Sequence, residues 1–304
     1  LHIMIDEEDF VKQVNDCGLA IIGQSGHLDP ADKKMYALRD VTATVSCIPL
    51  IASSIMSKKL AAGSDAILLD VKYGDGAFMN TVEEAKELAR TMIEIGDSLG
   101  KDTRATISNM SQPLGYAIGN SLEVKEAIDT LNGHGPEDLL ELCLQAGSHM
   151  LIQAQKTDSL ITARKMLEDA IESKKALRTL CAMVKAQGGD DAFIRHPEMF
   201  PKAKEVIPVY SQQTGYVKDL KAKPLGIVSM KLGGGREKTD DDIDYSVGLV
   251  LHKKIGDFVK KGEVLVEVHT NTGLSQELET EIFNAYDFSD EFVGKPQLID
   301  EVLS

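Results

Sequence analysis

Apolar positions follow two different patterns along the chain, one before about residue 205 and one after it. In the first part, compact apolar runs at 65–72 and 103–108 end in charged or polar residues, which is typical of buried parallel strands. Apolar residues spaced three or four apart predict helices around these strands, at 6–17, 82–99, 122–131, 136–146 and 160–185. Strands that alternate with helices indicate a parallel α/β sheet.

Two further apolar runs, 1–5 and 19–23, flank the first predicted helix and have the composition of short strands. The first of them opens the chain with no initiator methionine and no polar lead-in. We therefore expect that the complete protein has residues before Leu1.

Prolines at 197, 201 and 208 mark a linker, so we predict one domain at 1–204 and another at 205–304. Beyond the linker, short apolar runs near 215, 226, 247 and 264 predict strands separated by glycine and charged turns. The phrase at 254–265 resembles the turn and strand of biotinyl and lipoyl barrel-sandwich domains. Because no attachment loop accompanies it, we expect a mainly β, barrel-sandwich-like domain with no organic cofactor.

Composition and charge exclude some classes of function. The chain has 304 residues, 43% of them hydrophobic, and a formal net charge of −15, which argues against a general nucleic-acid surface. No apolar run approaches the roughly 18 residues of a membrane span. The four cysteines are widely spaced and form no metal-binding pair, so we expect free thiols and a soluble, cytoplasmic protein.

One helical segment concentrates polar groups on an apolar background. Pro49 near its start and Gly63 after its end suit a helix, and within it Ser54 and Lys58 stand four residues apart and point from one face. With Arg39 upstream, they offer two cations and a hydroxyl to a planar polar ligand. The alternative is an ordinary helix serine and a solvated cationic helix end.

The whole string decides between these alternatives. Tyr-Ala-Leu-Arg-Asp-Val-Thr-Ala-Thr-Val at 36–45 and Ser-Ile-Met-Ser-Lys-Lys at 54–59 closely resemble the pyrimidine-binding segment of the pyrimidine-nucleoside and thymidine phosphorylases. The resemblance implies that Arg39, Ser54 and Lys58 hold the pyrimidine ring. It places four more residues beside the base: Tyr36, Val45, Ile51 and Phe78.

The implied activity is reversible phosphorolysis of uridine, thymidine and deoxyuridine to the free base and a pentose 1-phosphate, with inorganic phosphate as co-substrate. The residues suit this chemistry because the base leaves with negative charge, which Arg39 and Lys58 would stabilise as catalytic cations. Tyr73 and Asp75 differ from the smaller residues associated with those positions, so the detailed shape of this wall is left open.

A second motif offers oxygen ligands. The segment 112–120 is broken by proline and glycine and is followed by a glutamate-containing helix, an arrangement that can aim carbonyls and one carboxylate at a hard cation. By resemblance, a potassium site falls on Leu114, Ala117 and Glu126. The alternative is a surface loop and an unrelated helix glutamate.

Three other patterns are weaker. The glycines at 233–235 lack the spacing of a phosphate loop, and the aspartates at 240–242 lack that of a calcium loop. The seven histidines include no metal-binding pair. We assign none of these a site.

One motif of the family is missing from this sequence. The family's Lys-His-Ser-Thr-Gly-Gly phosphate loop does not occur here, so we expect this chain alone to bind a pyrimidine weakly without measurable turnover. The family implies a homodimer through a small helical domain, to which residues 29–62 belong. Three alternatives are a thymidine-only enzyme, a related anthranilate-phosphoribosyltransferase type, and an inactive base-binding or oligomerising fragment.

Overall fold

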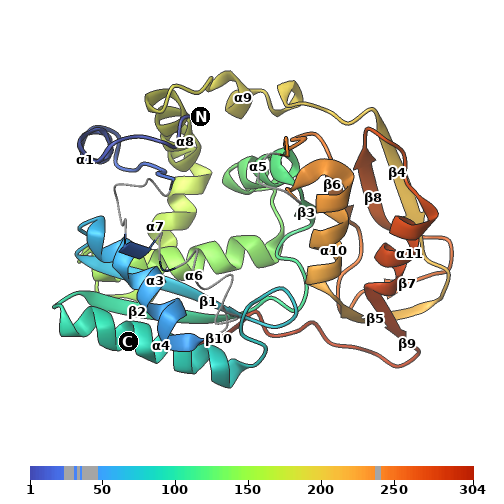
Figure 1. The fold of residues 1–304 in the computed structure, drawn as a ribbon, viewed down its shortest axis with the longest axis horizontal. Helices are drawn as coiled ribbons and strands as arrows, with labels where there is room; N and C mark the ends of the chain where they lie inside the picture. Colours follow the sequence, from blue (N-terminus) through green and yellow to red (C-terminus); the bar gives the residue numbers. More distant parts are fainter. Residues whose placement is uncertain (24–30, 33–34, 36–46, 237–240) are drawn as a thin grey trace.

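The computed structural model describes residues 1–23, 31–32, 35, 47–236 and 241–304 (Figure 1). An α/β part and a C-terminal part rich in antiparallel strands lie side by side, so the predicted fold class is confirmed. Among the described residues, no helix has both the length and the apolar character needed to span a membrane.

The sheet of the α/β part has the strand order β1-β2-β10. Strands β1 (Ala66–Tyr73) and β2 (Asp102–Asn109) are parallel, as predicted. The third strand, β10 (Ile299–Leu303), comes from the end of the chain and runs antiparallel to β2. The expected parallel sheet is therefore mixed, because a distant segment completes it.

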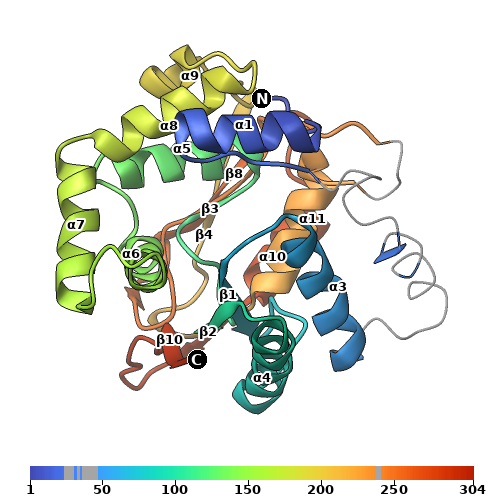
Figure 2. The same cartoon turned by 90° about the vertical axis from the view of Figure 1, so that its left-hand side faces the viewer.

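Helices cover both faces of this sheet (Figure 2). On one face, α3 (Ile48–Ala61) and α4 (Val82–Ser98) form a core with the strands. Gly96 lets α4 approach β2 closely, because a Cβ there would lie 1.9 Å from Thr103 Oγ1. On the other face lies α6 (Glu137–Gln153), where the Gln153 amide donates to the Asp102 carbonyl at 2.8 Å.

The remaining helices of this part form a layer away from the sheet. They are α1 (Glu7–Cys17), α5 (Asn120–Leu131), α7 (Leu160–Glu172), α8 (Lys175–Ala186) and α9 (Ala192–Arg195), followed by a 3-10 turn at Pro197–Met199. The single helix predicted at 160–185 is wrong in one respect. It is two helices, because Lys174 adopts a left-handed conformation with φ of 59°.

The strands predicted at 1–5 and 19–23 do not form. The two segments share one backbone hydrogen bond, from Gly23 N to Ile3 O at 2.7 Å. The buried amide of Gln187 holds them to α8 instead, since its Nε2 donates to the carbonyls of His2 and Ile21, each at 2.7 Å. One glutamine thus replaces a ladder of backbone hydrogen bonds.

The C-terminal part contains two antiparallel sheets. One has the order β3-β6-β8-β4 and the other β7-β5-β9. Their strands are β3 (Ala117–Ile118), β4 (Glu205–Tyr210), β5 (Gly215–Leu220), β6 (Gly248–Leu251), β7 (Phe258–Val259), β8 (Val264–Thr270) and β9 (Tyr286–Ser289).

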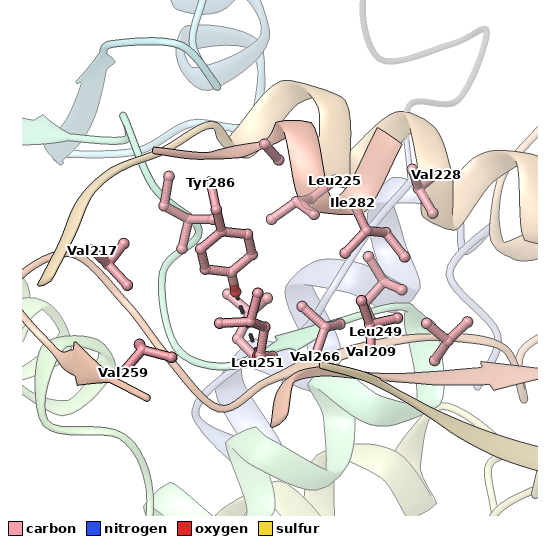
Figure 3. Packing of buried hydrophobic residues seen from close by; sticks show 14 of the residues in the cluster. Val209, Val217, Leu225, Val228, Leu249, Leu251, Val259, Val266, Ile282 and Tyr286 are labelled. Carbon is pink, nitrogen blue, oxygen red and sulfur yellow. Dashed lines mark hydrogen bonds between the residues drawn. The ribbon is translucent and has the colours of Figure 1, made fainter. Parts of the chain in front are cut away.

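Two helices complete the core of this part (Figure 3). They are α10 (Ala222–Ser229), which continues into a π-helical turn at Met230–Gly234, and α11 (Gln276–Asn284). The strand predicted near 226 is wrong, because Leu225, Val228 and Leu232 are spaced for one face of a helix and are buried there. They pack against strand residues such as Leu249 and Val266.

Two strands cross between the parts. β3 precedes the predicted linker but pairs with β6, and β10 follows it but pairs with β2. The division at residue 205 stays a prediction. The crossing at β3 has a direct consequence, because it fixes the segment 112–118 between the two parts.

Candidate functional site

A cavity of about 1090 Å³ opens at the carboxyl end of β1. Its walls come from α3, the loop 75–79, the segment 113–118, α5 and the start of α10. The carboxyl end of a parallel strand is the usual place for a ligand in an α/β sheet. Five sequence-predicted site residues line this cavity: Ile51, Phe78, Leu114, Ala117 and Glu126.

Ser54 and Lys58 are not among the residues that line this cavity, but each precedes by one position a residue of α3 that does, Ile55 and Lys59. Lys58 Nζ donates to Ser54 Oγ at 2.8 Å, so the two side chains share one face as the spacing predicts. The helix has Pro49 in its first turn and ends before Gly63, whose φ of 76° is left-handed. The helix thus presents a serine and a lysine already in contact.

Asp32 completes this polar group. It forms an ion pair with Lys58, Nζ to Oδ2 at 2.6 Å, and is only 6% exposed. An ammonium has three hydrogens, and these two contacts use two of them. Among the described residues no other acceptor takes the third hydrogen, so it can be donated to a ligand. Three other predicted base-site residues, Tyr36, Arg39 and Val45, lie outside the described residues.

Phe78 follows β1 in the loop between Gly74 and Met79. The residue is 69% exposed and lines the same cavity as Ile51. The loop packs tightly beneath it, since a Cβ on Gly76 would lie 2.9 Å from Met110 O. An exposed aromatic ring on a firmly packed loop is available to stack on a planar ligand.

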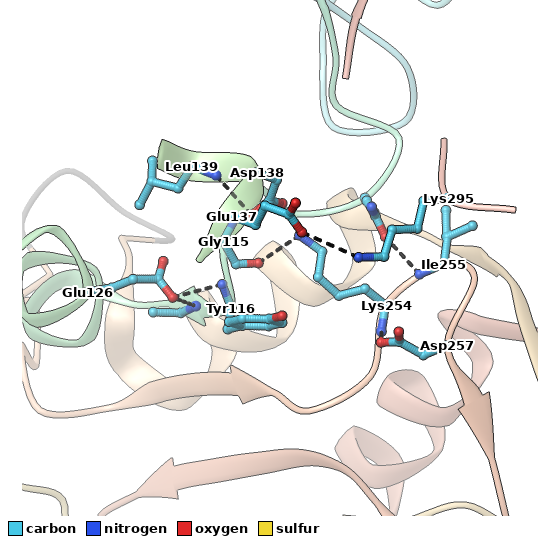
Figure 4. Close-up of polar contacts among 12 residues, drawn as sticks. Gly115, Tyr116, Glu126, Glu137, Asp138, Leu139, Lys254, Ile255, Asp257 and Lys295 are labelled. Carbon is cyan, nitrogen blue, oxygen red and sulfur yellow. Dashed lines mark hydrogen bonds and ion pairs between the residues drawn. The ribbon is translucent and has the colours of Figure 1, made fainter. Parts of the chain in front are cut away.

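Glu126 organises the proposed cation loop (Figure 4). Its Oε1 accepts hydrogen bonds from the backbone N–H groups of Tyr116 at 2.8 Å and Ala117 at 3.0 Å. Burial raises the pKa of Glu126 above 4.5, and the two N–H donors partly oppose that rise. Among the described residues, Oε2 accepts no hydrogen bond, so it remains able to ligate a cation.

The backbone direction at Ala117 suits the same purpose. Leu251 N donates to Tyr116 O at 2.8 Å, so Tyr116 directs its carbonyl toward β6. The next residue of a strand directs its N–H and carbonyl to the opposite edge. The Ala117 carbonyl therefore lies on the side where its N–H meets Glu126. A carboxylate and a carbonyl on one edge fit a hard monovalent cation.

Three lysines of the cavity wall were not among the predicted site residues: Lys59, Lys72 and Lys223. Lys59 follows Ile51 and Ile55 at intervals of four residues, so these three side chains form one line along α3. Burial, and secondarily the charge of Lys58, lower the pKa of Lys59. The spacing of four was visible in the sequence, but only the cavity shows which face of the helix matters.

The second is Lys72 on β1. Its Nζ donates to Asp70 Oδ2 at 2.5 Å and to Ser108 Oγ at 3.0 Å, and Ser108 in turn donates to Asp70. Asp70 and Lys72 alternate with Leu69 and Val71, which is the signal in the sequence. The alternation puts a paired cation on the sheet face opposite α4, within the cavity wall.

A pH-dependent difference in stability should follow from the raised pKa of Glu126. A carboxyl whose folded pKa is raised contributes stability below its unfolded pKa and loses that contribution as pH rises through the folded pKa. Without added cation, the wild type should therefore lose stability relative to Glu126→Gln as pH rises above 4.5. The free energy of unfolding of the variant minus that of the wild type should increase over this range. Urea titrations at several pH values measure this, and a constant difference would contradict it.

No group of three or more His, Cys, Asp or Glu side chains within the described part of the chain is arranged to hold a metal ion. The candidate cation loop does not depend on such a group. It offers one carboxylate, and the rest of its oxygens come from the backbone.

Two family models match this chain. The glycosyl transferase family, a/b domain, matches residues 1–177, and the pyrimidine nucleoside phosphorylase C-terminal domain matches residues 216–289. Both parts of the fold are thus accounted for by the two models.

Three similar relatives carry the same name. A pyrimidine-nucleoside phosphorylase of Staphylococcus haemolyticus is 56% identical over 270 residues, which is 89% of this chain and 62% of the relative. One from Geobacillus stearothermophilus is 52% identical over 303 residues, and one from Staphylococcus aureus 51%, each covering 100% of this chain and 70% of the relative. This chain belongs to the pyrimidine-nucleoside phosphorylase family.

Proposed function

We propose that this protein cleaves pyrimidine nucleosides with inorganic phosphate, releasing the free base and a pentose 1-phosphate. The observation that carries the proposal is the contact between Ser54 and Lys58 on α3, the helix whose Ile51 lines the cavity together with Phe78. Membership in the family supports the reaction class. Uridine, thymidine and deoxyuridine are the proposed substrates.

Recognition of the base follows from its hydrogen-bonding edge. Uracil and thymine present two carbonyl acceptors on either side of one N–H group. The remaining N–H of Lys58 suits a carbonyl, and the Ser54 hydroxyl can accept the ring N–H while it also accepts from Lys58. We assign the second carbonyl to Arg39. Ile51 and Phe78 supply apolar contact with the ring.

The same cations serve catalysis. When the glycosidic bond breaks, negative charge develops on the leaving base, and a cation already in place stabilises the transition state more than bound substrate. Asp32 and Ser54 hold the Lys58 ammonium by contacts of 2.6 and 2.8 Å, so little reorganisation is needed. Lys58 and Arg39 are therefore the proposed catalytic residues.

A potassium ion is the proposed inorganic cofactor, held by the carbonyls of Leu114 and Ala117 and the carboxylate of Glu126. The fit rests on the uncommitted Oε2 of Glu126 and on the direction of the Ala117 carbonyl. A bound ion would supply a fixed positive charge next to the cavity. No organic cofactor is proposed, and phosphate is the co-substrate.

An absorbance assay of base release tests the function. The full-length gene product should release uracil or thymine from uridine, thymidine and deoxyuridine only when phosphate is present. Release from thymidine alone would replace the proposal by a thymidine phosphorylase. No release from any of them, by folded protein, would favour the alternative of an inactive base-binding fragment.

We also propose a cytoplasmic homodimer. All four cysteines are free thiols, which supports a reducing compartment. The dimer rests on the family resemblance of residues 29–62, of which α3 is the longest described element. Sedimentation velocity should show the full-length protein at twice its monomer mass, and a monomer at all concentrations would contradict the dimer.

A further inference from the structure

One lysine of the C-terminal part reaches the proposed cation loop. Lys254 is 8% exposed, and its Nζ donates to the Gly115 carbonyl at 2.9 Å and forms an ion pair with Asp138 at the start of α6 (Figure 4). Burying an ammonium costs free energy unless its hydrogens are bonded. The two contacts of Lys254 therefore hold its side chain in this position. Its partners belong to the α/β part, about 116 and 139 residues away in sequence.

A single peptide group connects Lys254 with Glu126. The carbonyl of Gly115 and the N–H of Tyr116 belong to the same planar unit. The carbonyl accepts from Lys254, and the N–H donates to Glu126 Oε1 at 2.8 Å. A cation on the carbonyl polarises the peptide and strengthens its N–H as a donor. The ammonium and the carboxylate thus hold one peptide plane from opposite ends.

Further contacts fasten the same segment. Leu251 N donates to Tyr116 O at 2.8 Å, and Ile255 N donates to Gln112 Oε1 at 2.9 Å. Asp138 also accepts from Gly115 N at 3.3 Å. The turn 251–257 therefore holds the segment on one side while Glu126 holds it on the other.

We propose that Lys254 is a positioning residue for the cation site. Through the Gly115 peptide it sets the direction of the neighbouring Leu114 and Ala117 carbonyls and the place of the Glu126 carboxylate. The C-terminal part thereby controls the affinity of the catalytic part for a monovalent cation. The inference rests on the proposed function for the identity of the cation site.

The test compares Lys254→Met with wild type in the full-length gene product. Methionine keeps an unbranched side chain, one atom shorter than that of lysine, and removes its charge. The matched control is Lys261→Met, a lysine of the same part with an exposed side chain. Two readouts are used: the rise in Tm caused by KCl relative to choline chloride at equal ionic strength, and the KCl concentration that half-saturates phosphorolysis.

We expect Lys254→Met to raise the half-saturating KCl concentration about 10- to 100-fold, the usual effect of losing a group that orients a metal ligand. Its potassium-dependent rise in Tm should shrink correspondingly, and Lys261→Met should match wild type in both readouts. In a double-mutant cycle, Lys254→Met added to Glu126→Gln should cause no further loss of the potassium response, because both act on one peptide group.

A folded Lys254→Met variant with a wild-type potassium response would overturn the inference. A lower Tm with an unchanged half-saturating KCl concentration would also overturn it, because Lys254 would then only stabilise the fold. If Lys254→Met does not fold, the same two measurements are made on Lys254→Arg. Arginine keeps the charge but cannot repeat the ammonium geometry, so a shifted half-saturation supports the inference and an unchanged one overturns it.

The wild-type arm separates this inference from the proposed function. Wild type that releases base with phosphate but ignores potassium would overturn the inference and leave the function intact. Wild type that releases no base would overturn the function, and the Tm readout alone would then decide the role of Lys254.

Discussion

Replacing Lys58 by alanine should lower kcat/KM for pyrimidine-nucleoside phosphorolysis by about 2–4 kcal/mol, or roughly 30- to 900-fold. Alanine removes the ammonium that contacts both Ser54 and Asp32, and with it the charge proposed to stabilise the departing base. Arg39→Ala should have an effect of the same size. Ser54→Ala should cost less, because it removes a neutral contact.

The matched control is Lys185→Ala. Lys185 also stands in the last turn of a helix, α8, but its side chain is exposed and lies far in sequence from the base site. This variant should keep wild-type kcat/KM. If Lys58→Ala, shown by circular dichroism to be folded, behaved like Lys185→Ala, the assignment of Lys58 to the base would be wrong.

Gly115→Ala should lower the free energy of unfolding by about 2–4 kcal/mol. Gly115 has φ of 68°, a left-handed conformation that L side chains rarely adopt. An added Cβ would also lie 2.2 Å from Glu126 Oε2. The carboxylate must then shift away from the backbone N–H groups of Tyr116 and Ala117, from which it accepts hydrogen bonds. Urea unfolding measures the change, and the potassium response should be lost with it.

Gly133→Ala separates the two causes. Gly133 has φ of 82°, but nothing lies within 4 Å of the Cβ that alanine would add. Gly133→Ala should lower the free energy of unfolding only by the cost of a left-handed backbone conformation, about 1–2 kcal/mol. Equal losses at both positions would mean that Glu126 adapts to the methyl group at no cost, which would contradict a firmly held carboxylate.

Local signals in the sequence were sufficient for some elements. The early proline and following glycine correctly delimit α3, and the spacing of four correctly brings Ser54 next to Lys58. The apolar runs at β1 and β2 correctly predict parallel neighbours. Each of these depends on residues close together in the sequence, where helix and strand periods act directly.

Other elements depend on distant partners. The apolar run at 226–230 was predicted to be a strand, yet it lies in helix α10 and the turn after it, because its apolar residues complete the core with β6 and β8. β10 has no strong local pattern, and it pairs with the edge of β2 that faces away from β1. The break at Lys174 has no glycine or proline to announce it.

The site shows the same limit. Leu114, Ala117 and Glu126 were proposed from a resemblance, and the structure places them in one cavity wall. Lys254 could not be found in this way, because its partner Asp138 is 116 residues distant and no motif links them. Only tertiary packing brings an ammonium from the C-terminal part to a carbonyl of the loop.

Phosphorus NMR of the full-length gene product with uridine and inorganic phosphate tests the proposed reaction most directly. We expect a pentose 1-phosphate signal that grows in the same amount as free uracil, while inorganic phosphate falls equally. Release of uracil with no loss of inorganic phosphate would show hydrolysis instead, and would contradict the proposed phosphorolysis.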